Sequence, residues 1–242
     1  MNDHQLAAWL AGMAGRLVLP LRDGTLEPAH LGCVADLTAN AFITSALKRL
    51  RPDDPVLSEE TPDDRARLAG RRVWIVDPLD GTAEFRAGRE DWAVHVGLSI
   101  DGVAAVGAVA LPALGCCHST AKPHALAPQR GARPVLAVSR SRPPAETAGL
   151  ADHLGAELKG IGSAGFKAMA VLTGEADLYL HSGGQGEWDN CAPVAVATAA
   201  GLHASRLDGS LIRYNNPEPS VPDLLICRPE LAAPALAYLA GR

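Results

Sequence analysis

The chain has 242 residues, of which 48% are hydrophobic and 20% are charged, and this is typical of a packed globular protein with one large domain or two small ones. Its formal net charge is −5 and no run of Lys and Arg occurs, so we expect no nucleic acid polymer as a partner. A mildly acidic protein can still bind a phosphate ester, because a bound cation supplies local positive charge.

The five cysteines are odd in number, two are adjacent, and none forms a Cys-x-x-Cys pattern. This argues against a disulfide framework and against a structural zinc site, and it predicts reduced, buried thiols. The chain begins without a signal-peptide pattern, and no apolar run reaches transmembrane length. We therefore expect a cytoplasmic protein that has no membrane partner.

The first half of the chain predicts helices followed by antiparallel strands. Pro20 ends the first helix, Asp36 is a candidate N-cap of the second, and Asp101-Gly102 is typical of a hairpin turn. In chain order the expected elements are helices at 5–19 and 36–50 and strands at 73–76, 92–100 and 103–110.

The second half alternates between strands and helices, which indicates an α/β layer. The expected elements are strands at 135–138, 157–161, 176–181 and 224–227, and helices at about 143–153, 164–173, 189–200 and 229–240. Residues 112–134 are rich in Pro, Gly and Ala and predict a variable connection. We therefore expect two units: residues 1–134, with the antiparallel sheet and most metal ligands, and residues 135–242, with substrate contacts and the last metal-binding Asp.

The clearest candidate site is D-P-L-D-G-T at Asp77–Thr82, directly after a predicted strand. Two carboxylates in such a tight turn can converge on one cation, and the Leu79 carbonyl could also point inward. Mg²⁺ prefers octahedral oxygen ligands at about 2.0–2.1 Å, and the amides of Gly81 and Thr82 could hold a phosphate. A plain turn explains the same residues, because Asp, Pro and Gly favour turns.

Carboxylates elsewhere in the chain could complete such a site. Glu59 and Glu60 form an adjacent pair after Ser58, and adjacent side chains on a strand point to opposite sides. A solvated acidic loop is the alternative for this pair. Asp189, after Trp188, and Asp36 each have an N-cap as the alternative. In the functional interpretation Asp189 binds a metal, and Asp36 polarises the Thr82 hydroxyl.

Together these motifs resemble the inositol monophosphatase superfamily, which has an E-E pair, then D-P-L-D-G-T, then W-D before a helix of small residues. The sequence is most similar to the CysQ type, the 3′(2′),5′-bisphosphate nucleotidases, and to their actinobacterial branch. The stretches that carry this similarity are Val56–Glu60, Ser139–Pro144, Gly162–Lys167, Leu207–Gly209 and Tyr214-Asn215.

The resemblance implies a layered α-β-α-β-α sandwich and a Mg²⁺-dependent phosphomonoesterase. The implied substrate is 3′-phosphoadenosine 5′-phosphate, cleaved to AMP and phosphate downstream of sulfate assimilation. A homodimer and inhibition by Li⁺ are common in the family and are expected here. The implied ligands of two or three Mg²⁺ are Glu59, Asp77, Asp80, Asp189 and the Leu79 carbonyl.

The resemblance also assigns roles around the metals. Asp36, Glu59 and Thr82 are implied to be catalytic. The implied substrate-binding residues are Gly81, Thr82, Arg140, Ser163, Lys167, His181 and Asp189, with an ordinary surface charge as the alternative for Arg140, Lys167 and His181.

Some positions depart from the family pattern. Cys33 replaces a usual Thr, G-S-x-x-x-K is one residue longer than G-S-x-x-K, and His181 stands where some nucleotidases have Arg. Cys191 and Pro193 also interrupt the small-residue helix after Trp188-Asp189. Inositol monophosphate or fructose 1,6-bisphosphate therefore remains an alternative substrate, and a catalytically silent nucleotide sensor is a second alternative.

Overall fold

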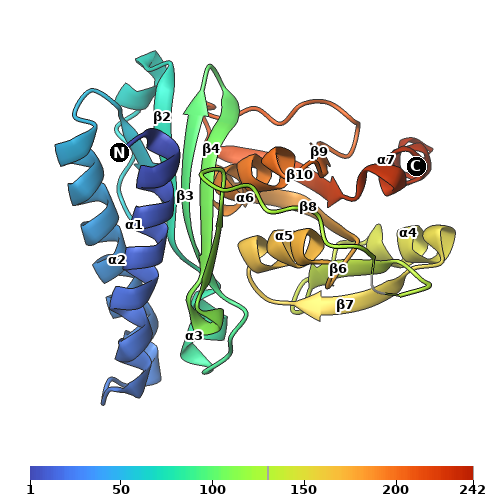
Figure 1. Ribbon diagram of the computed structural model, residues 1–242, viewed down its shortest axis with the longest axis horizontal. Helices are drawn as coiled ribbons and strands as arrows, with labels where there is room; N and C mark the ends of the chain where they lie inside the picture. The colour runs from blue at the N-terminus through green and yellow to red at the C-terminus, as the bar shows by residue number, and fades with distance from the viewer. Residues whose placement is uncertain (130, 242) are drawn as a thin grey trace.

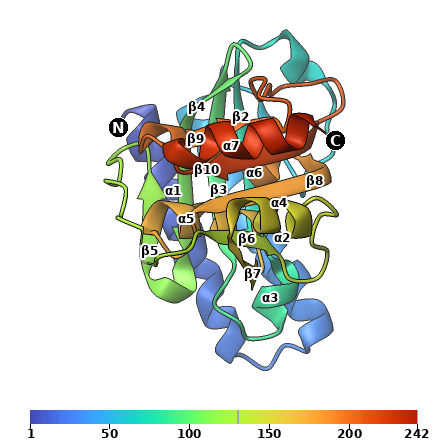
Figure 2. The ribbon, with the colours of Figure 1, turned by 90° about the vertical axis from the view of Figure 1, so that its right-hand side faces the viewer.

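The computed structural model describes residues 1–129 and 131–241. They form five layers in the order α-β-α-β-α, as expected (Figure 1). The outer layer on one side consists of α1 (Asp3–Val18) and α2 (Pro28–Leu50). The middle layer consists of α5 (Ala164–Thr173) and α6 (Glu187–Ala199). The outer layer on the other side consists of α4 (Thr147–Leu154) and α7 (Pro229–Ala240), which cover the second sheet in Figure 2.

Each sheet has five strands among the described residues. The first has the order β1-β2-β3-β4-β5, with only the β1–β2 pair parallel. Its strands are β1 (Val56–Ser58), β2 (Arg72–Asp80), β3 (Ala93–Ile100), β4 (Val103–Leu111) and β5 (Cys116–Ser119). The second has the mixed order β7-β6-β8-β10-β9. Its strands are β6 (Val135–Ser139), β7 (Glu157–Ile161), β8 (Leu178–Gly186), β9 (His203–Ser205) and β10 (Ser220–Cys227).

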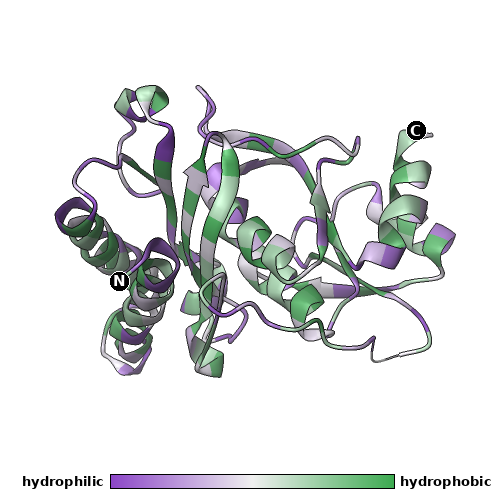
Figure 3. Ribbon diagram, turned by 45° about the horizontal axis from the view of Figure 1, so that its top comes forward, coloured by the Kyte–Doolittle hydropathy of each residue, from purple (hydrophilic) through white to green (hydrophobic). Residues whose placement is uncertain are grey.

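Three apolar clusters hold the layers together. One lies between α1, α2 and the first sheet, one between the two sheets around α5 and α6, and one between the second sheet and the α4–α7 layer. Figure 3 shows hydrophobic residues along the strands of the first sheet and on the middle helices. At Gly107 a Cβ atom would overlap the Ala192 carbonyl, so glycine allows α6 to pack directly on β4.

The structure corrects three sequence-based expectations. The second helix begins at Pro28, whose fixed φ suits a first helical turn, so Asp36 lies two turns inside α2 and is not an N-cap. The connection at 112–134 contains an edge strand, β5. Cys33, Cys116 and Cys117 are exposed free thiols, and only Cys191 and Cys227 are buried.

The remaining connecting turns are 3₁₀ or short α helices: η1 (Leu19–Asp23), η2 (Ala66–Ala69), α3 (Thr82–Arg86) and η3 (Pro112–Leu114). No helix among the described residues is both long and apolar enough to cross a membrane. The division into units 1–134 and 135–242 stays a prediction. The first sheet is built from the first range and the second sheet from the second, but α6 packs against β3 and β4.

Candidate metal centre

Parallel pairing of β1 with β2 brings the first two acidic motifs together. Ser58 is paired with Val76, and the Glu59 amide donates to the Val76 carbonyl over 3.3 Å. Glu59, directly after β1, and Asp77, within β2, therefore lie one residue beyond the last pair of the two strands. The two carboxyl groups act on each other, because the charge of Glu59, after the effect of burial, contributes to the raised pKa of Asp77.

An irregularity in β2 turns both aspartates of the D-P-L-D-G-T motif toward one place. Asp77 is paired with His95 and Asp80 with Ala93, so β2 has one more residue than β3 across this interval. The Leu79 amide donates to Asp77 Oδ1 over 3.0 Å, and Gly81 has a φ of 91° before α3 begins, which is a conformation that favours glycine. Such bulges re-aim side chains near active sites.

Asp36 reaches the same turn from the inside of α2. It is buried, and its Oδ2 lies 3.5 Å from the Thr82 hydroxyl, which also donates to the Leu79 carbonyl over 3.1 Å. Its Oδ1 is buried without a hydrogen-bond partner among the described residues. An unpaired buried carboxylate oxygen is costly, so this atom calls for a cation or an ordered water.

Asp189 arrives from the second half of the chain. It lies in the first turn of α6, whose N-cap is Gly186 and not Asp189 itself. Burial, Asp80 and Glu59 raise the pKa of Asp189 to about 7. The charges of Asp80 and Glu59 act on it, so the four motifs converge although they are far apart in the sequence.

The carboxylates of this cluster repel one another. Burial, followed by the neighbouring carboxylates, raises the pKa of Asp77 far above its usual range and raises that of Glu59 as well. Burial, Glu60 and Glu59 raise the pKa of Asp36 to about 8. Within the described ranges no Lys or Arg forms an ion pair with Asp36, Glu59, Asp77 or Asp189. This cluster lacks a compensating cation.

Asp80 behaves differently, although it lies three residues from Asp77 and is also buried. Burial raises its pKa, but His95 and a hydrogen bond from Ser163 outweigh that effect and hold the pKa at about 2. Its oxygens accept from Ser163 Oγ (2.5 Å), the Gly165 amide (2.6 Å) and the Ala164 amide (3.1 Å) at the start of α5. Asp80 thus links β2 to the second half of the chain.

His95 is a site residue that sequence reasoning missed. It is fully buried, its Nε2 lies 3.1 Å from Asp80 Oδ2, and its Nδ1 lies 3.1 Å from the Trp188 carbonyl. A Cβ atom at Gly165 would overlap Nε2, so glycine makes room for the ring. The only signal in the sequence was a histidine within the apolar strand 92–100.

The donor set fits a hard divalent cation. Ligand atoms of Asp77, Asp80 and His95 lie within 4.8 Å of one another, and the unpaired Asp36 oxygen lies on the same turn. Carboxylate and carbonyl oxygens suit Mg²⁺, and buried charges in proteins are paired or coordinate metals.

A cavity of about 390 Å³ opens beside these carboxylates, which is in the range of small-molecule sites. All predicted substrate-binding residues line it. They are Gly81, Thr82, Arg140, Ser163, Lys167, His181 and Asp189.

The three predicted basic contacts differ in how free their side chains are. Arg140 forms ion pairs with Asp91 (2.5 Å) and Glu84 (3.3 Å). The Lys167 ammonium is buried and donates to the carbonyls of Gly162 and Ser163 over 2.9 and 2.8 Å. His181 Nε2 lies 3.0 Å from the Gly184 carbonyl.

Arg142 lines the same cavity and was not predicted from the sequence. Its side chain is exposed, and its guanidinium has no hydrogen-bond or ion-pair partner in the part of the chain that the structure describes. It is therefore the most available cation at the cavity.

The layered fold and a buried cluster that could hold a metal ion are typical of a metal-dependent enzyme. The chain belongs to the inositol monophosphatase family, whose model matches residues 23–238, and this family is metal-dependent. A 3′-phosphoadenosine 5′-phosphate phosphatase of Mycobacterium leprae is 49% identical over 96% of this chain and 91% of its own length.

Two further similarities agree with this family. A 3′(2′),5′-bisphosphate nucleotidase CysQ of Escherichia coli K12 is 35% identical over 85% of this chain and 91% of its own length. The crystal structure of CysQ from Bacteroides thetaiotaomicron superposes with a TM-score of 0.81 and 26% identity, covering 93% of this chain and 97% of that one. The resemblance to the family and to its CysQ branch is confirmed.

Proposed function

We propose that this protein is a Mg²⁺-dependent phosphatase that hydrolyses 3′-phosphoadenosine 5′-phosphate to AMP and phosphate. The observation that carries the proposal is the 49% identity to a phosphatase of that name over 96% of the chain. The buried carboxylate cluster beside a cavity of about 390 Å³ supplies the machinery. Recycling of this nucleotide after sulfate assimilation would be its role.

Glu59, Asp77, Asp80, Asp189 and the Leu79 carbonyl would hold two or three Mg²⁺ ions. When bound, Mg²⁺ binds phosphate oxygens and lowers the pKa of a coordinated water. Support for these ligands comes from the shared positive pKa shifts of Asp77, Glu59 and Asp189, which are the shifts that a cation would reverse.

Asp36 and Thr82 would orient the attacking water. The Thr82 hydroxyl already donates to the Leu79 carbonyl, and Asp36 Oδ2 lies near it at 3.5 Å. Because the Thr82 hydroxyl can both donate and accept hydrogen bonds, it can accept a hydrogen bond from the water while its own O–H donates to a neighbouring oxygen. The amides of Gly81 and Thr82 would hold the scissile phosphate.

The other cavity residues would bind the nucleotide. Ser163, Lys167 and Arg140 line the cavity. The Lys167 ammonium donates to two backbone carbonyls and adds positive charge near the cavity. His181 and Arg142 also line the cavity, and the charge of Arg142 helps to lower the pKa of His181, after the effect of burial. We assign the second phosphate of the substrate to Arg142, because guanidinium groups bind phosphate with paired hydrogen bonds.

A panel of substrates tests the proposal. We expect kcat/KM for 3′-phosphoadenosine 5′-phosphate to exceed that for inositol 1-phosphate and for fructose 1,6-bisphosphate at one Mg²⁺ concentration. Faster turnover of inositol phosphate or fructose 1,6-bisphosphate would reverse the substrate assignment. Tight nucleotide binding without phosphate release at any Mg²⁺ concentration would support the silent sensor instead.

A homodimer, a cytoplasmic location and inhibition by Li⁺ stay predictions. Light scattering of the purified protein tests the first, and cell fractionation tests the second. Competition between Li⁺ and Mg²⁺ in the phosphatase assay tests the third, because a monovalent cation in a metal position supplies less charge to the phosphate.

A further inference from the structure

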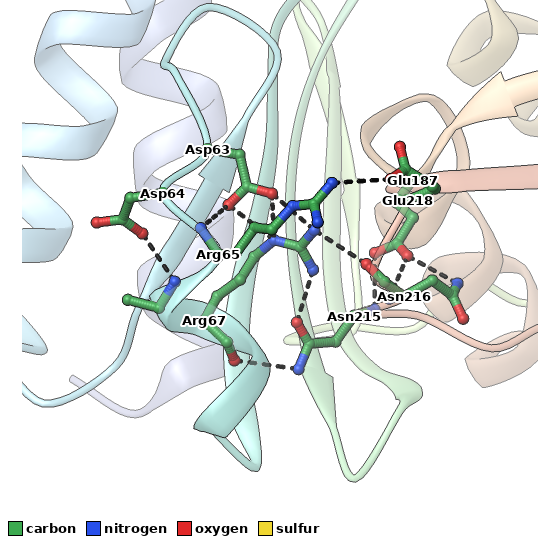
Figure 4. Close-up of polar contacts among 9 residues, drawn as sticks. Asp63, Asp64, Arg65, Arg67, Glu187, Asn215, Asn216 and Glu218 are labelled. Carbon is green, nitrogen blue, oxygen red and sulfur yellow. Dashed lines mark hydrogen bonds and ion pairs between the residues drawn. The ribbon is translucent and has the colours of Figure 1, made fainter.

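A second cluster of charged and amide side chains is built around the buried Arg67 and Glu187, to which no role has been assigned above (Figure 4). It consists of Asp63 and Arg67 after Glu59, of Asn215 and Asn216, and of Glu187 at the start of α6. We call these five residues the Arg67 clamp. They join three segments that are distant in the sequence.

Arg67 is the centre of the clamp. Its side chain is 1% exposed, and its Nη2 pairs with Asp63 Oδ2 over 2.8 Å. Nη1 donates to Asn215 Oδ1 over 2.8 Å, and Nη2 also donates to the Asn216 carbonyl over 3.0 Å. Every guanidinium nitrogen therefore has a partner, because Nε also donates to Asp63. Two of the nitrogens, Nη1 and Nη2, bond residues of the second half of the chain.

Glu187 is the anion on the other side of the clamp. It is 0% exposed. Its Oε2 accepts from the Asn215 amide (2.7 Å), and its Oε1 accepts from the Asn216 amide and Nδ2 (both 2.8 Å). The Asn215-Asn216 pair therefore connects the buried cation to the buried anion.

Asn215 is suited to this bridge. Its φ is 62°, in the left-handed region that Asn tolerates better than most residues. Its Nδ2 donates to the carbonyls of Arg67 and Gly70, each over 3.2 Å. One side chain thus holds both the guanidinium and the backbone of the segment after Glu59.

We propose that the Arg67 clamp is a positioning device that fixes Glu59 and Asp189 at the separation that the metals require, an inference that rests on the proposed function. Asp63 follows Glu59 by four residues, and Glu187 precedes Asp189 by two. Glu59 itself is exposed, directly after β1. The hydrogen bond from its backbone amide to the Val76 carbonyl holds only the end of β1 in place. The clamp connects that turn to the helix that presents Asp189.

The placement of the clamp favours this role over general stabilisation. Burying an ion pair gains little net stability, because desolvation offsets the attraction. The neighbouring surface pair of Arg65 and Glu218 spans the same two segments, but an exposed pair contributes little. Mutation of groups that orient the metal ligands without binding the metal themselves typically weakens metal affinity by about 10- to 100-fold.

Asn215→Gly is the test variant. Glycine accepts the positive φ and removes the three side-chain hydrogen bonds, to the Arg67 guanidinium and to the carbonyls of Arg67 and Gly70. The control is Arg72→Met, which removes an arginine paired with Asp54 and Asp3 (2.8 and 2.9 Å) at the far end of β2. Mn²⁺ is titrated into each substrate-free protein and followed by electron paramagnetic resonance. We expect Asn215→Gly to weaken Mn²⁺ binding about tenfold and Arg72→Met to leave it within twofold.

The phosphatase assay gives a second readout. In Asn215→Gly the Mg²⁺ concentration for half-maximal rate should rise by a similar factor, while kcat at saturating Mg²⁺ stays near wild type. Arg67→Lys is the second variant if Asn215→Gly folds poorly. Lysine keeps the charge, but its single ammonium nitrogen cannot replace the separate guanidinium nitrogens that bind Asp63 and Asn215.

Wild-type Mn²⁺ affinity in a folded clamp variant would overturn the inference, as would equal weakening in Arg72→Met. These outcomes are distinct from a failure of the proposed function. A chain that releases phosphate from inositol 1-phosphate faster than from the nucleotide, but shows the Mn²⁺ effect, refutes the substrate and keeps the clamp.

Discussion

The candidate metal centre and the Arg67 clamp are both clusters of charge built from distant segments, but they differ in how completely their carboxylates are partnered within the chain. In the clamp, hydrogen bonds from Arg67 hold the pKa of Asp63 below its usual value. Burial raises the pKa of Glu187, but hydrogen bonds from Asn215 and Asn216 oppose this effect, and both of its oxygens are partnered. In the metal centre, burial raises the pKa of Asp77 and Asp36, and one Asp36 oxygen has no partner among the described residues.

This difference distinguishes a structural cluster from a functional one. Carboxylates that repel one another without a cation destabilise the folded state. Their persistence in the fold indicates a ligand that binds after folding, whereas the clamp is complete without one. Removing a carboxylate should therefore harm the clamp but relieve the metal-free centre.

Asp77→Asn is the strongest test of this comparison. Loss of a central ligand should lower kcat/KM by about a thousandfold or more, since a bound metal supplies several kcal/mol of transition-state stabilisation. The same variant should be at least as stable as wild type in EDTA, because one repelling charge is gone. Asp101→Asn, at an exposed pair with Arg71, is the control. Near-normal activity in Asp77→Asn would refute the metal assignment.

Thr82→Val should have the next largest effect. Valine keeps the shape but removes the hydroxyl that lies between the Leu79 carbonyl and Asp36. If Thr82 orients the water, kcat should fall about a hundredfold, with Mn²⁺ affinity nearly unchanged. Thr82→Ser should keep most of the rate. Equal losses in the serine and valine variants would indicate a packing role for the methyl group.

The pH dependence of the metal-free protein extends the comparison to Asp189, because burial and neighbouring carboxylates raise its pKa to about 7. A carboxyl group with a raised folded pKa stabilises the fold fully below the unfolded pKa, and this contribution is lost as pH rises through about 7. In EDTA, wild type should therefore lose stability between pH 4 and 8 relative to Asp189→Asn, by up to a few kcal/mol.

Urea unfolding in EDTA across this pH range measures that difference. Added Mg²⁺ should reverse the trend for wild type, because metal binding needs ionised ligands and gains as they deprotonate. A difference between wild type and Asp189→Asn that does not change with pH would show that Asp189 titrates normally.

Local patterns predicted the parts of the molecule that are contiguous in the sequence. The turn at Asp77–Thr82 and the hairpin at Asp101-Gly102 carry their own signals, and the structure contains both the turn and the hairpin. The five-layer order came from the resemblance and not from the pattern of elements. The start of α2 was missed, because Asp36 also suits an N-cap and the actual start signal is Pro28, eight residues earlier.

The clamp and His95 could not be predicted because their signals are spatial. A histidine in an apolar strand is an ordinary core residue until Asp80 and Trp188 are placed beside it. Likewise, Arg67, Asn215 and Glu187 have no shared spacing, and only the folded chain brings them together. Of the cavity cations, the sequence could not show that Arg140 has carboxylate partners, whereas the Arg142 guanidinium has none within residues 1–129 and 131–241.

Arg142 gives the smallest predicted effect and the most specific one. Arg142→Ala should raise KM for 3′-phosphoadenosine 5′-phosphate about tenfold, as expected for the loss of a charge-assisted hydrogen bond, with kcat little changed. The KM for 3′-AMP, which lacks the second phosphate, should stay within twofold. Arg140→Met is the matched variant, and its loss of the Asp91 and Glu84 pairs should affect both substrates equally. An equal effect of Arg142→Ala on both substrates would show that Arg142 does not bind the second phosphate. The assignment of the metal centre would not change, because Arg142 contacts none of the carboxylates that distinguish that centre from the clamp.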